Sequence, residues 1–401
     1  MALKSTSCTG WLVAASTTMP GVTPTTTATI APTDWVSLAR EIGKSLQPAA
    51  ADNDRSGILP RDAFALLRKA GLVSALVPLE FGGGGASHAE MGGVLRELGR
   101  QDPAVAVTFS MHCHLLATQV WRHNHGMDAE KLFRKVAGEG AILVSTGASD
   151  WVRANGSARK VEGGFRVSAR KTPASGCEAG QVLVTSIRWE DAPDGPKVFH
   201  CSVPMNSEGV SIEQTWDTLG LRATGSHTVV LNDVFVPDAA VSLIRPGDEW
   251  HPIWNIVLGA AMPLIMAAYL GIADRAVEMA REALAGRSDP HLCHALGEML
   301  NAHTTAADVV DAMLRDSENL QFANTNDFSA RTLCRKSVAT DAVIATVRLA
   351  LEAVGGSAYT RNSEMERLYR DAHGALFHPL PRAKQTQFSG RVALGLTPYE
   401  G

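Results

Sequence analysis

The sequence predicts a mainly α protein with a β insert, because the spacing of its apolar residues changes twice along the chain. From Asp34 to about Gly140 the apolar residues recur at helical spacing. Between about Ala141 and Pro237 they alternate with polar residues, as in strands, and after Pro246 helical spacing returns. This order predicts an N-terminal helical domain, a middle β domain and a C-terminal helical bundle. The predicted boundaries are 33–140, 141–240 and 245–401, after a disordered extension over residues 1–32.

Length and composition indicate a globular chain and argue against two classes of partner. The 401 residues are 45% hydrophobic, which is enough for a large core. The formal net charge of −4 provides no positive field to attract nucleic acid. The longest apolar stretch, Ile253 to Leu270, contains Asn255 and Pro263 and is shorter than the roughly 20 residues that span a membrane. We therefore expect a buried core helix there, and neither a nucleic-acid nor a membrane partner.

The cysteines and the N-terminal segment predict a cytoplasmic location. Six cysteines are spread over the chain without the short paired spacing of metal sites or redox pairs, so we expect reduced thiols and no metal site. The apolar patch Trp11 to Ala15 is shorter than the apolar part of a secretory signal, which has about 7–15 residues.

The predicted N-terminal helical domain contains a capping-box pattern and a helix with two histidines. Ser87 and Glu90 have the spacing of a capping box, which predicts the start of a helix. A further helix is predicted from Ala104 to His123, and its apolar sequence includes His112 and His114. Because these histidines are two positions apart, at most one of them is expected to face a shared site. His112 is the predicted one.

The predicted β domain is divided by glycine and proline turns. Gly163-Gly164 is the clearest turn. Strands are predicted at 158–161, 165–171, 182–186 and 198–203.

The segment from Trp216 to Pro237, WDTLGLRATGSHTVVLNDVFVP, joins a glycine-containing loop to an alternating strand. Gly220 and Gly225 allow a sharp turn or a close approach of the backbone to a ligand. The loop is therefore suited to holding a planar cofactor, and an ordinary β-turn between two strands explains the same residues equally well.

Three long helices are predicted after the β domain, at 253–284, 292–319 and 329–354. Helices on both sides of one β insert do not suit a parallel dinucleotide-binding sheet, and the sequence contains no glycine-rich phosphate loop of that type.

This layout resembles the acyl-CoA dehydrogenase superfamily from about Asp34 to the C-terminus. Three segments carry the resemblance, namely 216–237, the strand end Arg170-Lys171-Thr172-Pro173-Ala174-Ser175-Gly176, and Glu352-Ala353-Val354-Gly355-Gly356 followed by Glu366-Arg367-Leu368-Tyr369-Arg370-Asp371-Ala372. The resemblance implies a flavin enzyme of the acyl-CoA dehydrogenase-like fold, with an N-terminal helical domain, a middle β-barrel-like domain and a C-terminal four-helix bundle.

The glutamate that removes the substrate α-proton in acyl-CoA dehydrogenases is missing at both family positions. In most of the family it lies about nine residues after the arginine of the Arg-Asp-Ala motif, where this chain has Pro379. In a second branch it lies on the first bundle helix, where an ungapped count gives Ala261. Neither residue can accept a proton.

A histidine occupies the C-terminal site instead. The sequence Phe377-His378-Pro379-Leu380-Pro381-Arg382-Ala383-Lys384 is similar to that of the flavin monooxygenases with this fold, such as dibenzothiophene monooxygenase, whose matching histidine lies by the flavin. The Ser175-Gly176 pair and the helix with His112 and His114 are also similar to that branch. His378 and His112 are thus the predicted catalytic residues.

Imidazole suits oxygen chemistry on a flavin for a physical reason. With an ordinary pKa of about 6.5 it donates a hydrogen bond near neutral pH, where a carboxylate would repel a developing peroxide anion. The plainer alternatives are a helix N-terminal residue for His378, a buried core residue for His112 and a turn-former for Ser175.

The resemblance assigns flavin binding to Ser175, Gly176, Trp216, Arg222, Thr224, Gly355 and Gly356. FMN and FAD both remain open, because the loop 283–290 lacks the aromatic residue that holds the ADP half of FAD in the dehydrogenases. The turn at Gly355-Gly356 resembles one that reaches a neighbouring subunit's flavin, which implies a homotetramer or homodimer. Trp216 and Arg222 have purely structural alternatives.

The predicted function is a flavin-dependent oxidoreductase of the acyl-CoA dehydrogenase fold, with a monooxygenase that uses reduced flavin, dioxygen and a small organic substrate favoured. A separate flavin reductase is an expected partner. The alternative is an acyl-CoA or acyl-carrier dehydrogenase with a relocated base, for which Glu352 and Glu364 are available. A third alternative is a flavin-binding protein without catalytic activity.

Overall fold

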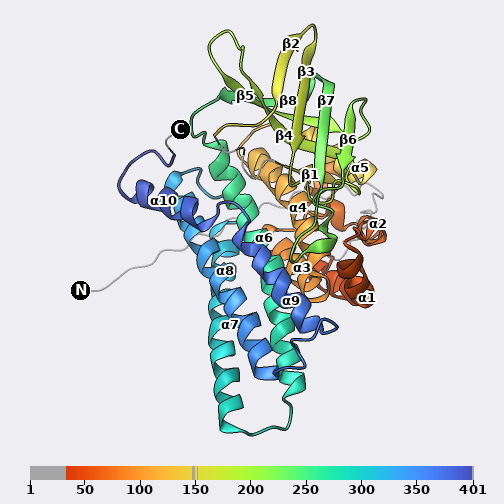
Figure 1. Ribbon diagram of the computed structural model, residues 1–401. Helices are drawn as coiled ribbons and strands as arrows, with labels where there is room; N and C mark the ends of the chain where they lie inside the picture. The colour runs from red at the N-terminus through yellow and green to blue at the C-terminus, as the bar shows by residue number, and fades with distance from the viewer. Residues whose placement is uncertain (1–32, 147–149, 151, 400–401) are drawn as a thin grey trace, which may run out of the picture. The chain divides into compact units, whose positions relative to one another are not determined.

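The computed structural model describes residues 33–146, 150 and 152–399, and residues 34–401 form one compact unit (Figure 1). The predicted N-terminal extension lies outside the described residues. The helices are α1 (Trp35–Ser56), α2 (Arg61–Lys69), α3 (His88–Gln101), α4 (Pro103–Asn124), α5 (Glu130–Glu139), α6 (Ile253–Ala283), α7 (Pro290–Asp316), α8 (Asn326–Val354), α9 (Glu364–Ala372) and α10 (Arg382–Ala393). The strands are β1 (Leu143–Ser145), β2 (Ser157–Val161), β3 (Gly164–Lys171), β4 (Val182–Trp189), β5 (Lys197–Pro204), β6 (Val210–Glu213), β7 (Thr228–Pro237) and β8 (Val241–Pro246).

The capping box that starts α3 is confirmed. The Ser87 hydroxyl accepts a hydrogen bond from Glu90 N at 3.2 Å, and a Glu90 carboxylate oxygen accepts one from Ser87 N at 2.7 Å. In the next helix, Asp102 caps the N-terminus by accepting from Val105 N at 3.1 Å, and Pro103 occupies the first turn, where no amide donor is needed. The Asp102 cap and Pro103 fix the start of α4, on which both predicted histidines lie.

The strands form two four-stranded sheets with the orders β1-β4-β5-β8 and β2-β3-β7-β6. The Gly163-Gly164 turn is confirmed, because it joins β2 to β3 and Gly163 has a φ of 72°. Apolar side chains from both sheets, such as Phe165 and Phe199, whose ring centroids are 4.5 Å apart, share one core. The predicted β-barrel-like domain therefore consists of two separate sheets packed face to face.

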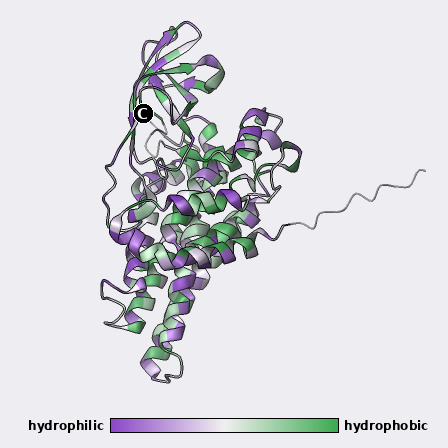
Figure 2. Cartoon of the chain, turned by 90° about the vertical axis from the view of Figure 1, so that its right-hand side faces the viewer, coloured by the Kyte–Doolittle hydropathy of each residue, from purple (hydrophilic) through white to green (hydrophobic). Residues whose placement is uncertain are grey.

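The apolar stretch Ile253 to Leu270 lies in α6, whose bounds agree within one residue with the helix predicted at 253–284. Helix α6 is long and apolar enough to cross a membrane, but 94% of its most apolar window is buried in the protein. In Figure 2, hydrophobic residues, in green, are frequent in the helices near the middle of the view. Burial by α3, α4, α7 and α8 thus accounts for the apolar sequence of α6.

The other two bundle helices are placed by local backbone signals. Helix α7 ends at Asp316, three residues before the predicted end, because Glu318, Asn319 and Leu320 have φ values of 47°, 50° and 65°, which a right-handed helix excludes. Helix α8 begins at Asn326, because the Thr325 hydroxyl accepts a hydrogen bond from Phe328 N at 3.2 Å.

The loop before β7 is tied to helix α9. Leu221 N donates to an Asp371 carboxylate oxygen at 2.5 Å, and Arg370 donates to Leu219 O at 3.0 Å. A Cβ at Gly220 would lie 2.4 Å from the Arg370 backbone, so only glycine permits this approach. The contact joins a loop of the β domain to the C-terminal helices beside the cavity described next.

Candidate functional site

A cavity of about 710 Å³ lies between helices α4 and α6, the loops of the β sheets and the connection from α9 to α10. This volume lies within the range of about 300–1,000 Å³ that is usual for small-molecule sites. Its walls are mainly apolar, and polar side chains are placed among them at separate points.

His378 lies in the wall of this cavity, in the connection between the short 3-10 helix His373–Leu376 and α10. Its ring packs edge-on against Tyr269, with centroids 5.5 Å apart, and its nitrogens have no hydrogen-bond partner among the described residues. Burial, assisted by the positive charge of Lys336, lowers the pKa of His378 to about 3. The ring is therefore neutral at physiological pH, and it does not begin α10, which starts at Arg382.

The prediction that His112 rather than His114 faces the site is wrong. His112 does not line the cavity, since its Nε2 donates to Val73 O at 2.8 Å and its Nδ1 accepts from Leu143 N at 3.0 Å. His114 lies on the opposite side of α4 and lines the cavity. Two positions along a helix correspond to a rotation of about 200°, so the two rings face different directions.

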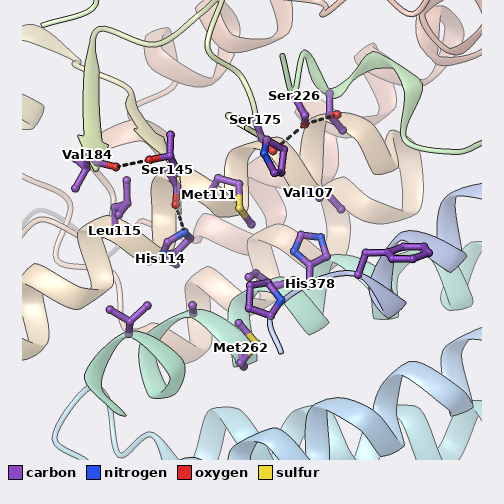
Figure 3. A pocket seen from close by; sticks show the side chains of 18 of the residues that line it. Val107, Met111, His114, Leu115, Ser145, Ser175, Val184, Ser226, Met262 and His378 are labelled. Atoms are coloured by element: carbon purple, nitrogen blue, oxygen red, sulfur yellow. Dashed lines mark hydrogen bonds between the residues drawn. The ribbon is translucent and has the colours of Figure 1, made fainter. Parts of the chain in front are cut away.

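His114 is held in place by one hydrogen bond, and its second ring nitrogen is buried without a partner among the described residues. The bonded nitrogen is Nε2, which lies 3.0 Å from Ser145 Oγ, and the unpartnered one is Nδ1. Burial lowers the pKa of His114 to about 4, so this ring is also uncharged at neutral pH. Figure 3 shows His114, Met262 and His378 around the same space.

None of the described residues that line the cavity is an aspartate or a glutamate. Ala261 and Pro379, the residues at the two family positions of the glutamate base, both lie in the wall. The carboxylates considered as substitutes lie elsewhere and are paired: Glu352 with Arg348 at 2.6 Å and Glu364 with Arg275 at 3.0 Å. No carboxylate among these residues can therefore remove a proton from a ligand in the cavity.

Hydroxyl groups line the side of the cavity formed by the β-domain loops. Ser226 Oγ donates to Ser175 Oγ at 2.8 Å and lies 2.7 Å from Thr224 Oγ1. Because Ser175 accepts this bond, its own proton is free to donate to a ligand. Ser175 and Thr224, both predicted, line the cavity, together with Ser226, which the sequence analysis missed.

Trp216 lines the cavity and Arg222 does not. The Trp216 indole Nε1 donates to Leu221 O at 3.0 Å, which fixes the ring. Arg222 donates to Asp54 O and Thr218 O, at 3.0 and 3.1 Å. The guanidinium therefore ties the loop to α1, and direct flavin contact by Arg222 stays a prediction.

Gly176, Gly355 and Gly356 do not line the cavity, whereas Gly220 of the loop before β7 does. Gly176 has a φ of 70° and donates from its N to Thr224 O at 2.9 Å, so it shapes the turn that presents Ser175. Gly355 and Gly356 lie just after α8, away from the cavity, and nothing lies within 4 Å of a Cβ added at either position. In a single chain they contact no cofactor site, and their contact with a neighbouring subunit stays a prediction.

The cavity is also lined by residues that were not predicted from the sequence, namely Ser145, Met111, Met262, Arg122 and His200. Ser145 ends β1, where a polar residue follows an apolar strand, which was a usable signal. Within the described ranges no group of three or more His, Cys, Asp or Glu side chains is arranged to hold a metal ion, and the five described cysteines are free thiols.

The cavity fits a flavin. Trp216 provides an aromatic face, Met111 and Met262 are polarisable apolar walls, and Ser175 and Thr224 provide hydroxyls at one edge. The unpartnered Nδ1 of His114 is an orphaned buried polar atom in a residue of the cavity wall.

Two domain models match the chain. Acyl-CoA dehydrogenase, N-terminal domain, matches residues 37–138, and acyl-CoA dehydrogenase, C-terminal domain, matches residues 263–381, which together are more than half of the chain. The chain belongs to the acyl-CoA dehydrogenase superfamily. The predicted fold class, with helical domains on either side of a β domain, is confirmed.

Relatives of this superfamily member include proteins of different activities. The putative acyl-CoA dehydrogenase YdbM of Bacillus subtilis is 28% identical over 367 residues, covering 86% of this chain and 92% of the relative. Amino sugar nitrososynthase DnmZ of Streptomyces peucetius is 26% identical over 378 residues, covering 88% and 90%. Dibenzothiophene monooxygenase of Mycolicibacterium goodii is 27% identical over 268 residues, covering 62% of each chain.

Solved structures of superfamily members have the same fold. A nitrososynthase from Micromonospora carbonacea var. africana superposes with a TM-score of 0.82 at 24% identity, covering 90% of this chain and 96% of that one. KijD3 in complex with FMN and dTDP-3-amino-2,3,6-trideoxy-4-keto-3-methyl-D-glucose superposes with a TM-score of 0.80 at 25% identity, covering 91% and 95%. The predicted class, a flavin-dependent oxidoreductase with monooxygenase activity favoured over acyl-CoA dehydrogenation, is confirmed by the relatives.

Proposed function

We propose that this chain is a monooxygenase that uses reduced FMN and dioxygen to add one oxygen atom to a nitrogen or sulfur atom of a small organic substrate. The observation that carries the proposal is the combination of two neutral imidazoles, His114 and His378, with a cavity whose described lining contains no carboxylate. The relatives named as nitrososynthases and as dibenzothiophene monooxygenase support nitrogen and sulfur as the oxygenated atoms.

A bound reduced flavin would supply the two electrons that reduce one atom of dioxygen to water while the other atom enters the substrate. Ser175, whose proton is free, would donate a hydrogen bond to the cofactor, and Trp216 would provide an aromatic face for its ring. His378 and His114 hold a proton at a ring nitrogen and donate it toward the oxygen that gains negative charge. The apolar walls, including Met111 and Met262, keep water away from that oxygen.

The complex with FMN of the structural neighbour KijD3, together with the short 283–290 loop, supports FMN over FAD. The proposal includes a separate flavin reductase that supplies the reduced cofactor. It also includes a cytoplasmic location and a homotetramer or homodimer, in which the exposed turn at Gly355 and Gly356 contacts a second subunit.

The test is oxygen consumption by the purified protein with FMN, a flavin reductase and NADH, in the presence of a panel of small amines and thioethers. The expected result is a product that gains one oxygen atom, formed only when the reductase is present. Bleaching of the oxidised flavin by an acyl-CoA thioester under anaerobic conditions, without oxygenated products, would instead identify a dehydrogenase.

A further inference from the structure

The cavity continues well beyond the two imidazoles discussed above. Along α4 its lining runs from His114 to Arg122, and along α6 it runs from Met262 back to Trp254. Each run covers eight residues, which corresponds to about 12 Å at the rise of an α-helix. We call the end with Arg122 and His200 the distal end.

Arg122 provides an unused positive charge at the distal end. Its guanidinium has no hydrogen-bond partner among the described residues, and its Nε is buried. Arg370, the other arginine of the cavity wall, is fully engaged by Asp54 at 2.7 Å and by Glu366 at 2.7 Å. An arginine is a strong recognition group for phosphate or carboxylate when no protein acid neutralises it.

His200 is held beside Arg122 as a hydrogen-bond donor. Its Nε2 lies 3.1 Å from Nε of the buried Arg245, and a guanidinium can only donate, so Nε2 must be the acceptor. Arg245 is itself fixed by the carbonyl oxygens of Val152 and Asp150, at 2.9 and 3.2 Å. A neutral imidazole that accepts at Nε2 carries its proton on Nδ1, which has no partner among the described residues. His200 thus offers one N–H to a ligand.

The charges around the distal end are predominantly positive. Burial, followed by the charge of Arg245, lowers the pKa of His200 to about 3, and Lys171 and Arg122 act in the same direction. The nearby Asp150 carboxylate is paired with the buried Lys171 at 2.7 Å. A ligand group with negative charge is therefore stabilised here, whereas an ammonium group is repelled.

We propose that Arg122 and His200 form a binding site for an oxyanion, a phosphate or carboxylate carried by the flavin or by the substrate, about 12 Å from His114 along the cavity. The inference deepens the proposed function and rests on it, since it assigns the charged end of the ligand that the same cavity takes. It specifies a substrate or cofactor with an acidic group at that distance from its reacting centre.

The experiment compares the wild-type protein with Arg122→Met, with Arg122→Lys, and with Arg134→Met as a control for loss of one exposed positive charge outside the cavity. In the first arm, the affinities for FMN and riboflavin, which share one ring system and differ by the phosphate, are measured by flavin fluorescence. In the second arm, the affinities for cinnamate, cinnamide and cinnamylamine, which differ only at one end, are measured by titration calorimetry. Thermal unfolding of each variant confirms that it is folded.

The outcomes separate the two sources of the oxyanion. If the phosphate belongs to FMN, Arg122→Met weakens FMN binding about ten- to hundredfold and leaves riboflavin binding unchanged. If the oxyanion belongs to the substrate, flavin binding is unchanged, cinnamate binding weakens by a similar factor and cinnamide binding does not. Arg122→Lys retains part of the affinity in either case, and Arg134→Met retains all of it.

Equal affinities of the wild type and Arg122→Met in both arms would overturn the inference. His200→Phe gives an independent check, because it removes the second donor and leaves Arg122 in place. A wild-type protein that binds neither FMN nor riboflavin contradicts the proposed function. Cinnamate and cinnamide binding to the flavin-free protein and to Arg122→Met then still tests whether Arg122 binds an oxyanion. The two failures are therefore distinguishable.

Discussion

The two ends of the cavity share helices α4 and α6 but differ in charge. At the end with His114 and His378 the polar groups are neutral imidazoles among apolar side chains. At the distal end the guanidinium of Arg122 has no acidic partner among the described residues. The difference indicates two separate roles, in which neutral groups at one end donate protons to a reacting oxygen and a permanent charge at the other end orients the ligand.

The largest expected effect is a loss of stability in acid, because five histidines are buried and uncharged, of which His114, His200 and His378 line the cavity. In the unfolded chain a histidine takes up a proton near pH 6.5, whereas burial lowers the pKa to about 3 or 4 in the folded protein. The residues concerned are His88, His112, His114, His200 and His378.

Between these pKa values the unfolded state binds more protons, so the free energy of unfolding falls as the pH falls. Each histidine contributes up to about 1.4 kcal/mol per pH unit below pH 6.5. Asp371, whose pKa is raised by burial to about 7, opposes part of this loss. Urea unfolding at about pH 7.5, 6.5 and 5.5, on both sides of the ordinary pKa of histidine, measures the slope. A free energy of unfolding that stays constant down to the lowest pH would show that these rings are not held neutral.

Replacing His378 by alanine is expected to have the next largest effect. Removal of a proton donor at the reacting end lowers the rate of substrate oxygenation about a hundredfold, while flavin oxidation continues with release of hydrogen peroxide. The measurement is the ratio of oxygenated product to peroxide in the reductase-coupled assay. His123→Ala, at a position on α4 outside the cavity lining, serves as the control and should leave the ratio unchanged.

The two histidines of α4 provide a matched pair. His112→Ala removes a donor and an acceptor for two buried backbone groups, Val73 O and Leu143 N, so it should lower the free energy of unfolding by about 2–3 kcal/mol with little change in activity per folded molecule. His114→Ala should lower activity about tenfold with a smaller loss of stability. Denaturant unfolding and the oxygenation assay on both variants test this, and the reverse pattern contradicts the assignment of the faces of α4.

The smallest expected effect is the difference in stability between variants in which one or the other arginine of the cavity wall is replaced by methionine. Arg370→Met leaves Asp54 and Glu366 without their cation and should destabilise the protein by about 1–2 kcal/mol. Arg122→Met breaks no ion pair and should change stability by less than about 0.5 kcal/mol. Thermal unfolding in the absence of ligand compares the stability of the two variants. An equal loss of stability in both variants would mean that Arg122 has a structural role.

Much of the fold follows from local sequence signals. The capping box at Ser87 and Glu90 and the Gly163-Gly164 turn are determined by neighbouring residues, and the structure has both where they were predicted. The end of α7 was misplaced because Glu318, Asn319 and Leu320 adopt positive φ, which their side chains do not signal.

The candidate site was only partly predictable. The absence of the base at Ala261 and Pro379 was readable from spacing along the chain, and both residues do line the cavity. Which of His112 and His114 faces the cavity depends on how α4 packs against Val73 and β1, and that contact is distant in sequence. Arg122 and His200 meet only through tertiary packing of α4 on a sheet, so no local pattern relates them.

The central claim is that neutral imidazoles, and no carboxylate, face the reacting centre, and peroxide release in the absence of substrate tests it most directly. Protein loaded with reduced FMN under anaerobic conditions is mixed with air-saturated buffer, and hydrogen peroxide is followed over time beside free reduced FMN. The account predicts delayed release from the wild-type protein and release from His378→Ala as fast as from free reduced FMN. Equal rates for the wild type, the variant and the free cofactor would contradict it.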